Sequence, residues 1–219
     1  MPPDAAEHVI CDETVRQAVA GDRAALDRLA TQLEPHTHRM VIARLSPQPN
    51  QWHAVEEIVQ ESLAGLVQSI TTLERADASG LRAYLGRIVD HKVADRIRKQ
   101  GRPGRWTGSL RGLHDTGQSL SGSPPLAAWL SATGITPRTA ADEREQIEGM
   151  LHCLGRLKDE HRLAITYAFF DQLRTAEIAE RMGITRAAAS MLLLRAIRAL
   201  RSAMDQPLGE RDDRSPPAR

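Results

Sequence analysis

Basic side chains gather in one short stretch of the chain, where they could bind an anionic polymer. Between Leu81 and Arg105 two acidic residues, Asp90 and Asp95, stand against eight basic ones: Arg82, Arg87, Lys92, Arg96, Arg98, Lys99, Arg102 and Arg105. This excess of six positive charges is notable because the whole chain has a formal net charge of only +1. A basic stripe on a near-neutral protein is a candidate site for nucleic-acid phosphates. The alternative is a solvated helix face without a ligand.

A second DNA-binding pattern lies between Thr175 and Arg201. The letters TAEIAERM predict a short helix, Gly183 supplies a left-handed turn residue, and Thr185 can cap the helix that follows. Together these features predict a helix-turn-helix, whose second helix enters the major groove by its N-terminal end. An unrelated helical hairpin is the alternative.

The second helix of this motif is rich in Ala, Leu and Met, and its period divides them into two faces. With Leu193 at the centre of the buried stripe, the inner side holds Ala189, Ala196, Ile197, Leu200 and Met204. The outer side holds Ala187, Ala188, Met191, Arg195 and Arg198, and Leu194 lies at the edge of this side. Small apolar side chains can touch thymine methyl groups, and the arginines suit phosphates. We therefore expect only modest discrimination between DNA sequences.

The basic stripe and the helix-turn-helix are both expected to lie on helices, because the composition of the chain favours helices over strands. Aromatic residues make up only 3% of the chain, so its cores must be built from Leu, Ile, Val and Ala. Apolar periodicity predicts helices over 13–22, 23–45, 53–73, 81–100, 141–157, 159–171, 175–182 and 185–204. Pro35 is expected to kink or interrupt the second of them.

The composition changes between Gly101 and Thr136, where Gly, Ser and Pro predominate and predict a linker, with one short helical turn near 126–132. The tail is polar and contains proline, which is typical of disorder. The expected fold is all-α, with two helical domains joined by a flexible linker. Its parts are an N-terminal extension (1–11), a first domain (12–100), the linker (101–138), a second domain (139–204) and the tail (205–219).

Several classes of protein are disfavoured. Cys11 and Cys153 are far apart and form neither a disulfide framework nor a zinc motif. The N-terminus lacks the features of a signal peptide, and no apolar run approaches the roughly 18 residues of a membrane helix. We expect a cytoplasmic protein with no membrane association.

An enzyme is the alternative of a different class. Six residues could suggest a di-metal helical bundle: His36, His38, His53, Glu56, Glu57 and His91. That site requires Glu-x-x-His pairs on two helices, and the sequence has none. It also lacks a Gly-rich phosphate loop, a nucleophile elbow and an HExxH motif. We expect no catalytic site, metal or cofactor, and interpret His36 and His38 as exposed residues at a helix end.

Three segments together resemble one family. VEEIVQESLAGLVQSI, LRAYLGRIVDHKVADRIRK and LRTAEIAERMGITRAAASMLLLRAIRALR resemble bacterial RNA polymerase sigma factors of the small extracytoplasmic-function type (sigma-70 group). The segments occur in the family's order, and the likeness covers about 12–100 and 140–204. It implies a region 2 domain that docks on polymerase and captures the −10 promoter element, and a region 4 domain that reads the −35 element.

The resemblance also assigns residues. Those implied to contact the clamp helices of the polymerase largest subunit are Glu57, Gln60 and Glu61; a solvated helix face is the alternative. Those implied to bind the −10 element are Arg82, Arg87, Arg98 and Lys99. Tyr84 stands where the family often has Trp, and we expect it to pack in the core. Those implied to bind the −35 element are Thr185, Arg186, Ala187, Ser190, Met191, Leu194, Arg195 and Arg198.

Some positions depart from the family pattern. Arg174 replaces the usual Ser or Thr cap, for which Thr175 can substitute, and His91 stands where Asn is common. Ser190, Leu192 and Leu194 replace basic or polar residues, which weakens the expected reading of the −35 element. The implied partners are RNA polymerase core, through the clamp helices and the flap, and promoter DNA. An anti-sigma factor is a further partner that the resemblance allows. The alternative function is a helix-turn-helix regulator that does not bind polymerase core.

Overall fold

The structure, a computed structural model, describes residues 10–45, 52–99 and 140–205, with the side chains of 140–146 left out. The expected linker and its helical turn lie outside the described residues, as do the tail beyond Asp205 and most of the N-terminal extension. Every element in the described ranges is helical, which confirms the all-α class.

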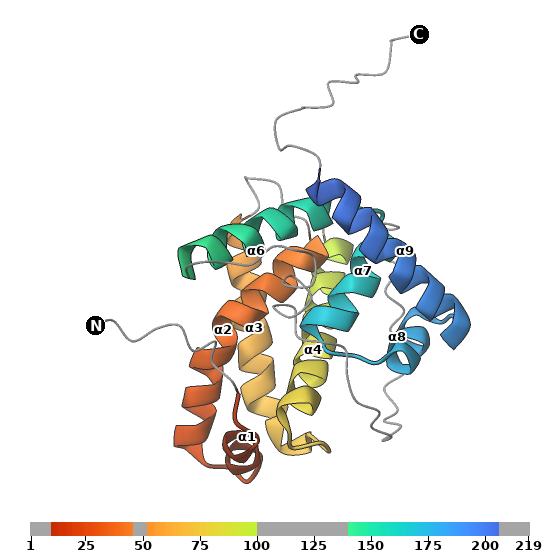
Figure 1. The fold of residues 1–219 in the computed structure, drawn as a ribbon. Coiled ribbons are helices and arrows are strands. Elements are labelled where there is room, and N and C mark those ends of the chain that lie inside the picture. Colours follow the sequence, from red (N-terminus) through yellow and green to blue (C-terminus); the bar gives the residue numbers. More distant parts are fainter. Residues whose placement is uncertain (1–9, 46–51, 100–139, 206–219) are drawn as a thin grey trace.

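The first described helices form a bundle, which we call the N-terminal bundle. It consists of α1 (Asp12–Val19), α2 (Arg23–Leu45), α3 (Trp52–Ser69), the short 3-10 helix η2 (Ile70–Thr72) and α4 (Ala78–Lys99). Helix α2 packs against α3 and α4, and α1 packs against α2 and η2. Figure 1 shows α2, α3 and α4 running alongside one another, with α1 at one end. Apolar residues of all four helices meet in its core.

Local chemistry sets the start and course of α2. Gly21 takes the left-handed φ of 94° after α1, and Asp22 Oδ1 then accepts hydrogen bonds from the backbone N–H groups of Ala24 (2.8 Å) and Ala25 (3.3 Å). Of the kink or interruption expected at Pro35, the interruption is wrong, because α2 continues through it. Pro35 and Thr31, whose carbonyl loses its helical partner, are both exposed, so water can satisfy that carbonyl.

Helix α4 begins three residues before the expected start at Leu81. Asp77 Oδ1 accepts a hydrogen bond from the Gly80 N–H at 2.6 Å, and Asp12 Oδ1 accepts one from the Ala78 N–H at 2.8 Å. Gly80 is required at this turn, because a Cβ there would lie 2.3 Å from the backbone oxygen of Arg75. The start of α4 is therefore fixed to α1.

The remaining helices form the C-terminal bundle. It consists of α6 (Ala140–Gly155), α7 (Asp159–Ile165), the π-helical turn η3 (Thr166–Phe170), α8 (Thr175–Met182) and α9 (Arg186–Met204). Helix α9 packs against α6, α7 and α8, and in Figure 1 it forms the outer edge of the molecule, with α8 beside its N-terminal half. The four helices expected here are confirmed.

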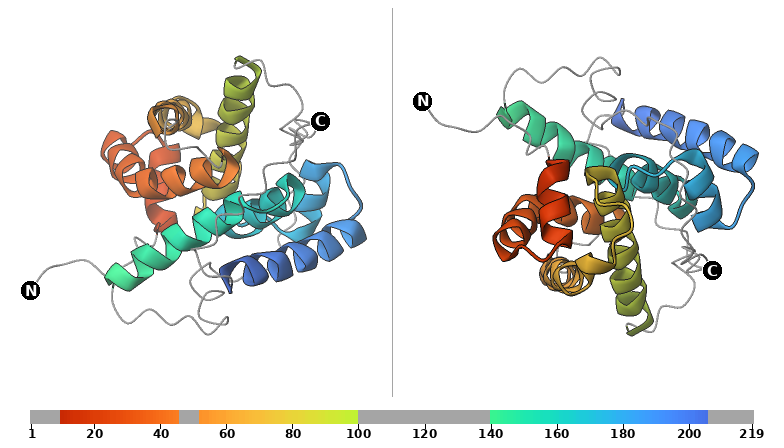
Figure 2. Two further views of the ribbon diagram at one scale, coloured as in Figure 1. Left: turned by 90° about the horizontal axis from the view of Figure 1, so that it is seen from above. Right: turned by 90° about the horizontal axis from the view of Figure 1, so that it is seen from below.

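The two bundles are docked on each other. Helix α2 contacts α6, α7 and η3, and α4 contacts η3. Their buried apolar residues belong to one continuous cluster, and the views in Figure 2 show the bundles packed together from above and from below. The sequence predicted the two units but not this docking. No helix in the described parts of the chain has both the length and the apolar character needed to cross a membrane.

Candidate functional site

The helix-turn-helix is built by local interactions at two helix starts. At α8, Arg174 is the N-cap residue, and its backbone N–H donates to Glu177 Oε2 at 2.7 Å. The expected substitution of Thr175 as the cap is therefore wrong, because the third residue of the helix satisfies the cap position instead. The turn is as expected: Gly183 has a left-handed φ of 68°, and Thr185 Oγ1 accepts a hydrogen bond from the Ala188 N–H at 3.2 Å.

Helix α9 presents its expected outer face to solvent. All eight residues assigned to the −35 element are exposed: Thr185, Arg186, Ala187, Ser190, Met191, Leu194, Arg195 and Arg198. Ala189, Ala196 and Leu200 are buried, whereas Leu193 is half-buried, so the inner stripe is centred nearer to Ala196 than to Leu193. The predicted division into faces is confirmed.

The charge of α9 has one sign. The helix contains four arginines and no acidic residue. Its exposed N-terminal half also carries Met191 and Leu194, whose exposed fractions are 49% and 42%. A helix N-terminus with unopposed arginines attracts phosphate, and the apolar side chains between them can contact base methyl groups. This face has the chemistry of a DNA-binding surface.

The polar face of α3 is exposed but its charges are paired. Glu57 Oε2 lies 2.7 Å from Arg96 Nη1, and Glu61 Oε2 lies 3.1 Å from Lys92 Nζ. The third assigned residue, Gln60, is exposed and donates to Glu34. The two carboxylates are therefore held in place by α4, and two charges of the basic stripe already have partners within the protein.

The four residues assigned to the −10 element do not form one cluster. Arg98 and Lys99 are exposed at the C-terminal end of α4, where Arg98 pairs with Asp95. Arg87 is half-buried over the Tyr84 ring, 5.4 Å from its centroid. Arg82 lies 16 positions before Arg98, about 24 Å along a straight helix. The structure thus spreads these cations along α4.

Arg82 and Tyr84 lie near the N-terminal end of α4, at the other end of this row of cations. Arg82 Nη1 donates to Gln172 Oε1 of the C-terminal bundle at 3.3 Å. Tyr84 is half-buried, and its hydroxyl bonds to Thr72 Oγ1 at 3.1 Å and to the Ser69 carbonyl at 3.3 Å. Tyr84 therefore packs onto the bundle with its hydroxyl bonded, much as expected.

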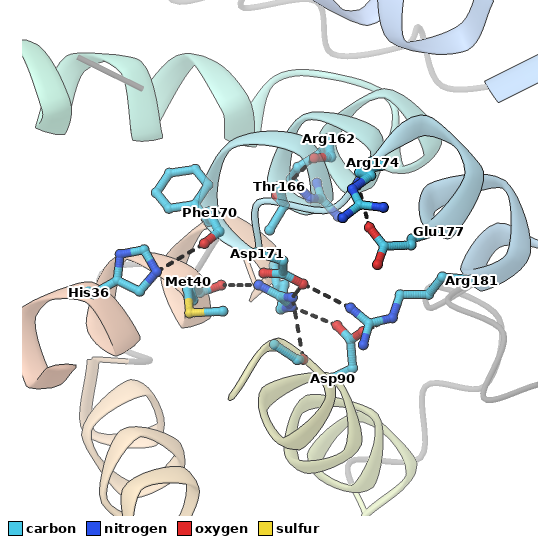
Figure 3. A network of polar contacts seen from close by, with 12 residues as sticks. His36, Met40, Asp90, Arg162, Thr166, Phe170, Asp171, Arg174, Glu177 and Arg181 are labelled. Carbon is cyan, nitrogen blue, oxygen red and sulfur yellow. Dashed lines mark hydrogen bonds and ion pairs between the residues drawn. The ribbon is translucent and has the colours of Figure 1, made fainter. Parts of the chain in front are cut away.

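A buried charge network that sequence reasoning missed joins the bundles. Arg44 Nε donates to Asp90 Oδ1 at 2.7 Å, and Arg44 Nη2 donates to Asp171 Oδ2 at 2.6 Å. Arg181 Nη1 donates to the same Asp171 oxygen at 3.0 Å. Figure 3 shows Asp171 and Arg181 facing Asp90 across the boundary between the bundles. The available signal was Arg44 itself, which follows the apolar letters MVIA.

Burial and pairing act against each other in this network. Burial desolvates Arg44, but Asp171 and Asp90 outweigh this effect and raise the pKa of Arg44 above its usual range. Burial raises the pKa of Asp171, and Arg44 and Arg181 oppose that rise. Both groups are fully enclosed in protein, so each depends on its partner for the charge to be tolerated.

The histidines of α2 differ from their expected exposure at a helix end. Both lie inside α2, and half-buried His36 has its Nε2 3.0 Å from the Phe170 carbonyl of the C-terminal bundle. His38 Nε2 lies 2.9 Å from Glu56 Oε1, and its ring stacks on Trp52. The expectation was wrong for His36 because docking of the second bundle covers it. Burial and the charge of Arg82 lower the pKa of His36 to about 4.

This His36 contact predicts a pH effect on stability. The unfolded chain protonates His36 below pH 6.5, whereas the folded protein keeps it neutral to about pH 4, with Arg82, Arg39 and Arg44 facing it. The unfolded state therefore binds more protons between these values, and stability falls as the pH falls. From pH 6.5 to 5.5 the wild type should lose about 1 kcal/mol more unfolding free energy than His36→Gln.

The measurement is urea unfolding of both proteins at the two pH values. His53→Gln is the matched control, since it makes the same change at an exposed histidine of α3, and it should lose more stability than His36→Gln over this pH range. Equal losses in wild type and His36→Gln would contradict the assignment of a neutral His36 to the docked state.

In the described parts of the chain no three His, Cys, Asp or Glu side chains gather closely enough to hold a metal ion. The exposed surfaces are the cationic face of α9, the ion-paired face of α3 and the cationic end of α4. The last two adjoin, because Glu57 and Glu61 of α3 pair with Arg96 and Lys92 of α4.

Two family models match these parts of the chain. Residues 36–103 match Sigma-70 region 2, and residues 153–202 match Sigma-70, region 4. The chain belongs to the sigma-70 family. It is thus a sigma factor with a role in promoter recognition, and the N-terminal and C-terminal bundles carry its regions 2 and 4.

A solved structure shares the fold of this sigma factor. It is described as the structure of CnrH in complex with the cytosolic domain of CnrY, and it is 17% identical in sequence with a TM-score of 0.51. The similarity covers 90% of this chain and 97% of the CnrH chain. No curated protein matched the chain.

Proposed function

We propose that this sigma factor is of the small extracytoplasmic-function type and binds RNA polymerase core to start transcription at promoters with −10 and −35 elements. The observation that carries the proposal is the match to regions 2 and 4 in order, combined with a solvent-exposed cationic face on α9. We assign region 2 to 12–100, the linker to 101–138 and region 4 to 139–204, and place the protein in the cytoplasm with the polymerase.

Polymerase docking is assigned to the exposed face of α3. Glu57, Gln60 and Glu61 offer two carboxylates and an amide to a basic partner surface, here the clamp helices of the largest subunit. The ion pairs with Arg96 and Lys92 support this role, because they hold the carboxylates in fixed positions on the surface. Region 4 is assigned to the polymerase flap.

Capture of the −10 element is assigned to α4. Arg98 and Lys99 are exposed and can reach phosphates, for which Arg98 would exchange its surface partner Asp95. Arg87 and Arg82 are half-buried, so their use requires the side chains to turn out of their present contacts. We therefore assign the first phosphate contacts to the C-terminal end of the helix.

A protein partner that controls this sigma factor is a further part of the proposal. CnrH, which shares the fold, was solved in complex with the cytosolic domain of CnrY. This supports a protein partner for the present chain, and we assign that role to an anti-sigma factor.

Reading of the −35 element is assigned to α9, and it yields a salt-dependence prediction. Arg195 is exposed among apolar residues and suits a phosphate, so Arg195→Ala should weaken binding equally on a matched and a scrambled duplex. It should also lower the slope of log affinity against log salt concentration by about 0.9. The measurement is a salt titration of the full chain on both duplexes.

Arg16→Ala is the control for that titration, because it removes an exposed arginine from α1. It should leave both affinities and the slope unchanged. A loss confined to the matched duplex would mean that Arg195 reads a base.

The function itself is tested by run-off transcription with polymerase core on a genomic promoter library, with and without the protein. Discrete transcripts that depend on the protein are expected. A protein that binds DNA but neither binds core nor directs transcripts would instead be the helix-turn-helix regulator that is the alternative function.

A further inference from the structure

We propose that Arg44, Asp90, Asp171 and Arg181 form a latch that holds the C-terminal bundle on the N-terminal bundle, and that this latch must open before the sigma factor can engage a promoter. The consequence for transcription rests on the proposed function. The latch itself is a property of the two bundles and can be tested without polymerase or DNA.

Each bundle contributes one acid and one base to the latch. Arg44 and Asp90 come from the N-terminal bundle and pair at 2.7 Å, while Asp171 and Arg181 come from the C-terminal bundle and pair at 3.0 Å. The ion pairs that cross the boundary join Arg44 to Asp171 at 2.6 Å and Arg181 to Asp90 at 3.7 Å, the second of them too long for a hydrogen bond.

This arrangement suits a contact that opens and closes. Removing one member of a buried ion pair is costly because a charge remains without a partner. When these bundles separate, however, each keeps an internal pair and gains water. Opening therefore leaves no unpaired buried charge, and the closed and open states can both be stable. This differs from a core ion pair, whose loss accompanies unfolding.

The surfaces around the latch fit closely. A Cβ at Gly86 would lie 2.3 Å from Asp171 Oδ2, so only glycine admits the carboxylate at this position of α4. The guanidinium groups of Arg44 and Arg181 both lie over the buried Tyr167 ring, 5.7 and 5.1 Å from its centroid. Gln172, which bonds to Arg82 across the boundary, has an unusual positive φ of 56°.

The closed arrangement conflicts with promoter engagement. Elements at −10 and −35 are 25 base pairs apart by their names, which is about 85 Å of straight B-DNA at 3.4 Å per pair. A compact chain of 219 residues has a radius of gyration of about 17 Å, or roughly 45 Å across. The docked bundles therefore cannot reach both elements. Docking also occupies Arg82, one of the residues assigned to the −10 element.

Gly86→Ala in the full chain tests the latch, with Gly149→Ala as its matched control. Both changes add one methyl group within a helix, where Ala is more favourable than Gly. A methyl at position 86 meets the Asp171 carboxylate, whereas nothing lies within 4 Å of a Cβ at position 149. Small-angle scattering should show a larger radius of gyration for Gly86→Ala only, with the helical circular dichroism of all three proteins alike.

Asp171→Asn is the second variant, because it keeps the side-chain shape and removes the charge that binds Arg44 and Arg181. It should also expand the chain. If folded Gly86→Ala and Asp171→Asn both stay as compact as the wild type, the latch is overturned, whatever the protein does in transcription.

Core binding tests the second half of the proposal. A variant with a larger open population should bind polymerase core more tightly in proportion to that population, roughly tenfold if only a tenth of the wild type is open. If the variants expand without any gain in core affinity, the link between latch and function is overturned while the latch stands. If even the wild type does not bind core, the proposed function fails separately.

Discussion

Reversing Glu57 and Glu61 to arginine is expected to weaken binding to polymerase core by roughly a hundredfold while leaving helical content unchanged. Both carboxylates are exposed on the α3 face assigned to docking. Placing like charges against a basic partner costs several kcal/mol, and about 2.7 kcal/mol corresponds to a hundredfold in Kd. A titration of labelled protein with core measures the change.

Because Glu57 and Glu61 also form ion pairs with α4, the double reversal needs a variant in which those pairs are restored. Arginine at 57 and 61 would also repel Arg96 and Lys92, so a fourfold variant with Arg96→Glu and Lys92→Glu restores both pairs in reverse. It should still fail to bind core. The control reverses the exposed pair Glu13–Arg16 on α1, which should not affect binding. Normal core binding by the fourfold variant would show that this face of α3 is not the docking surface.

Replacing Arg44 with leucine should lower the free energy of unfolding by at most about 3–5 kcal/mol, the usual cost of removing one partner from a buried ion pair, because separation of the bundles hydrates the carboxylates left behind and limits the loss. Arg44 is fully buried and donates to Asp90, Asp171 and the carbonyls of Met40 and Gly86. Leucine fills much of the space but bonds to none of these groups. Urea unfolding followed by circular dichroism measures the loss.

A double-mutant cycle separates this ion pair from general packing damage. If Arg44 and Asp171 are coupled, Arg44→Leu combined with Asp171→Asn should cost clearly less than the sum of the single changes. Arg16→Leu, at an exposed pair, should change stability by less than about 0.5 kcal/mol. Additive losses would mean that the two side chains contribute independently.

The sequence predicted the features that depend on neighbours within a few residues. The outward face of α9 follows from helical period, and Gly183 and Thr185 act through backbone groups within three residues of them. The cap of α8 was misassigned although its determinant was visible, since Glu177 stands at the third helical position and can reach back to the Arg174 N–H.

Features set by docking could not be predicted in the same way. Arg44 and Asp171 are 127 residues apart in the chain, and no periodic pattern relates positions on separate bundles. His36 looked exposed because its neighbours are polar, but its burial depends on Phe170 of the other bundle. The assigned cation Arg82 likewise bonds to Gln172 in the turn after η3, and Arg96 of the same basic stripe pairs with Glu57 of α3, contacts that sequence alone does not specify.

The uniform charge of α9 has a kinetic meaning. Its arginines face solvent even while the bundles are docked, so the chromosome's electric field can attract this helix before polymerase is involved. Such contacts are independent of base sequence; they speed association with DNA toward the diffusion limit and allow a protein to slide and hop along it. The sigma factor with docked bundles would then be bound non-specifically to the chromosome, rather than free in solution, when it encounters polymerase.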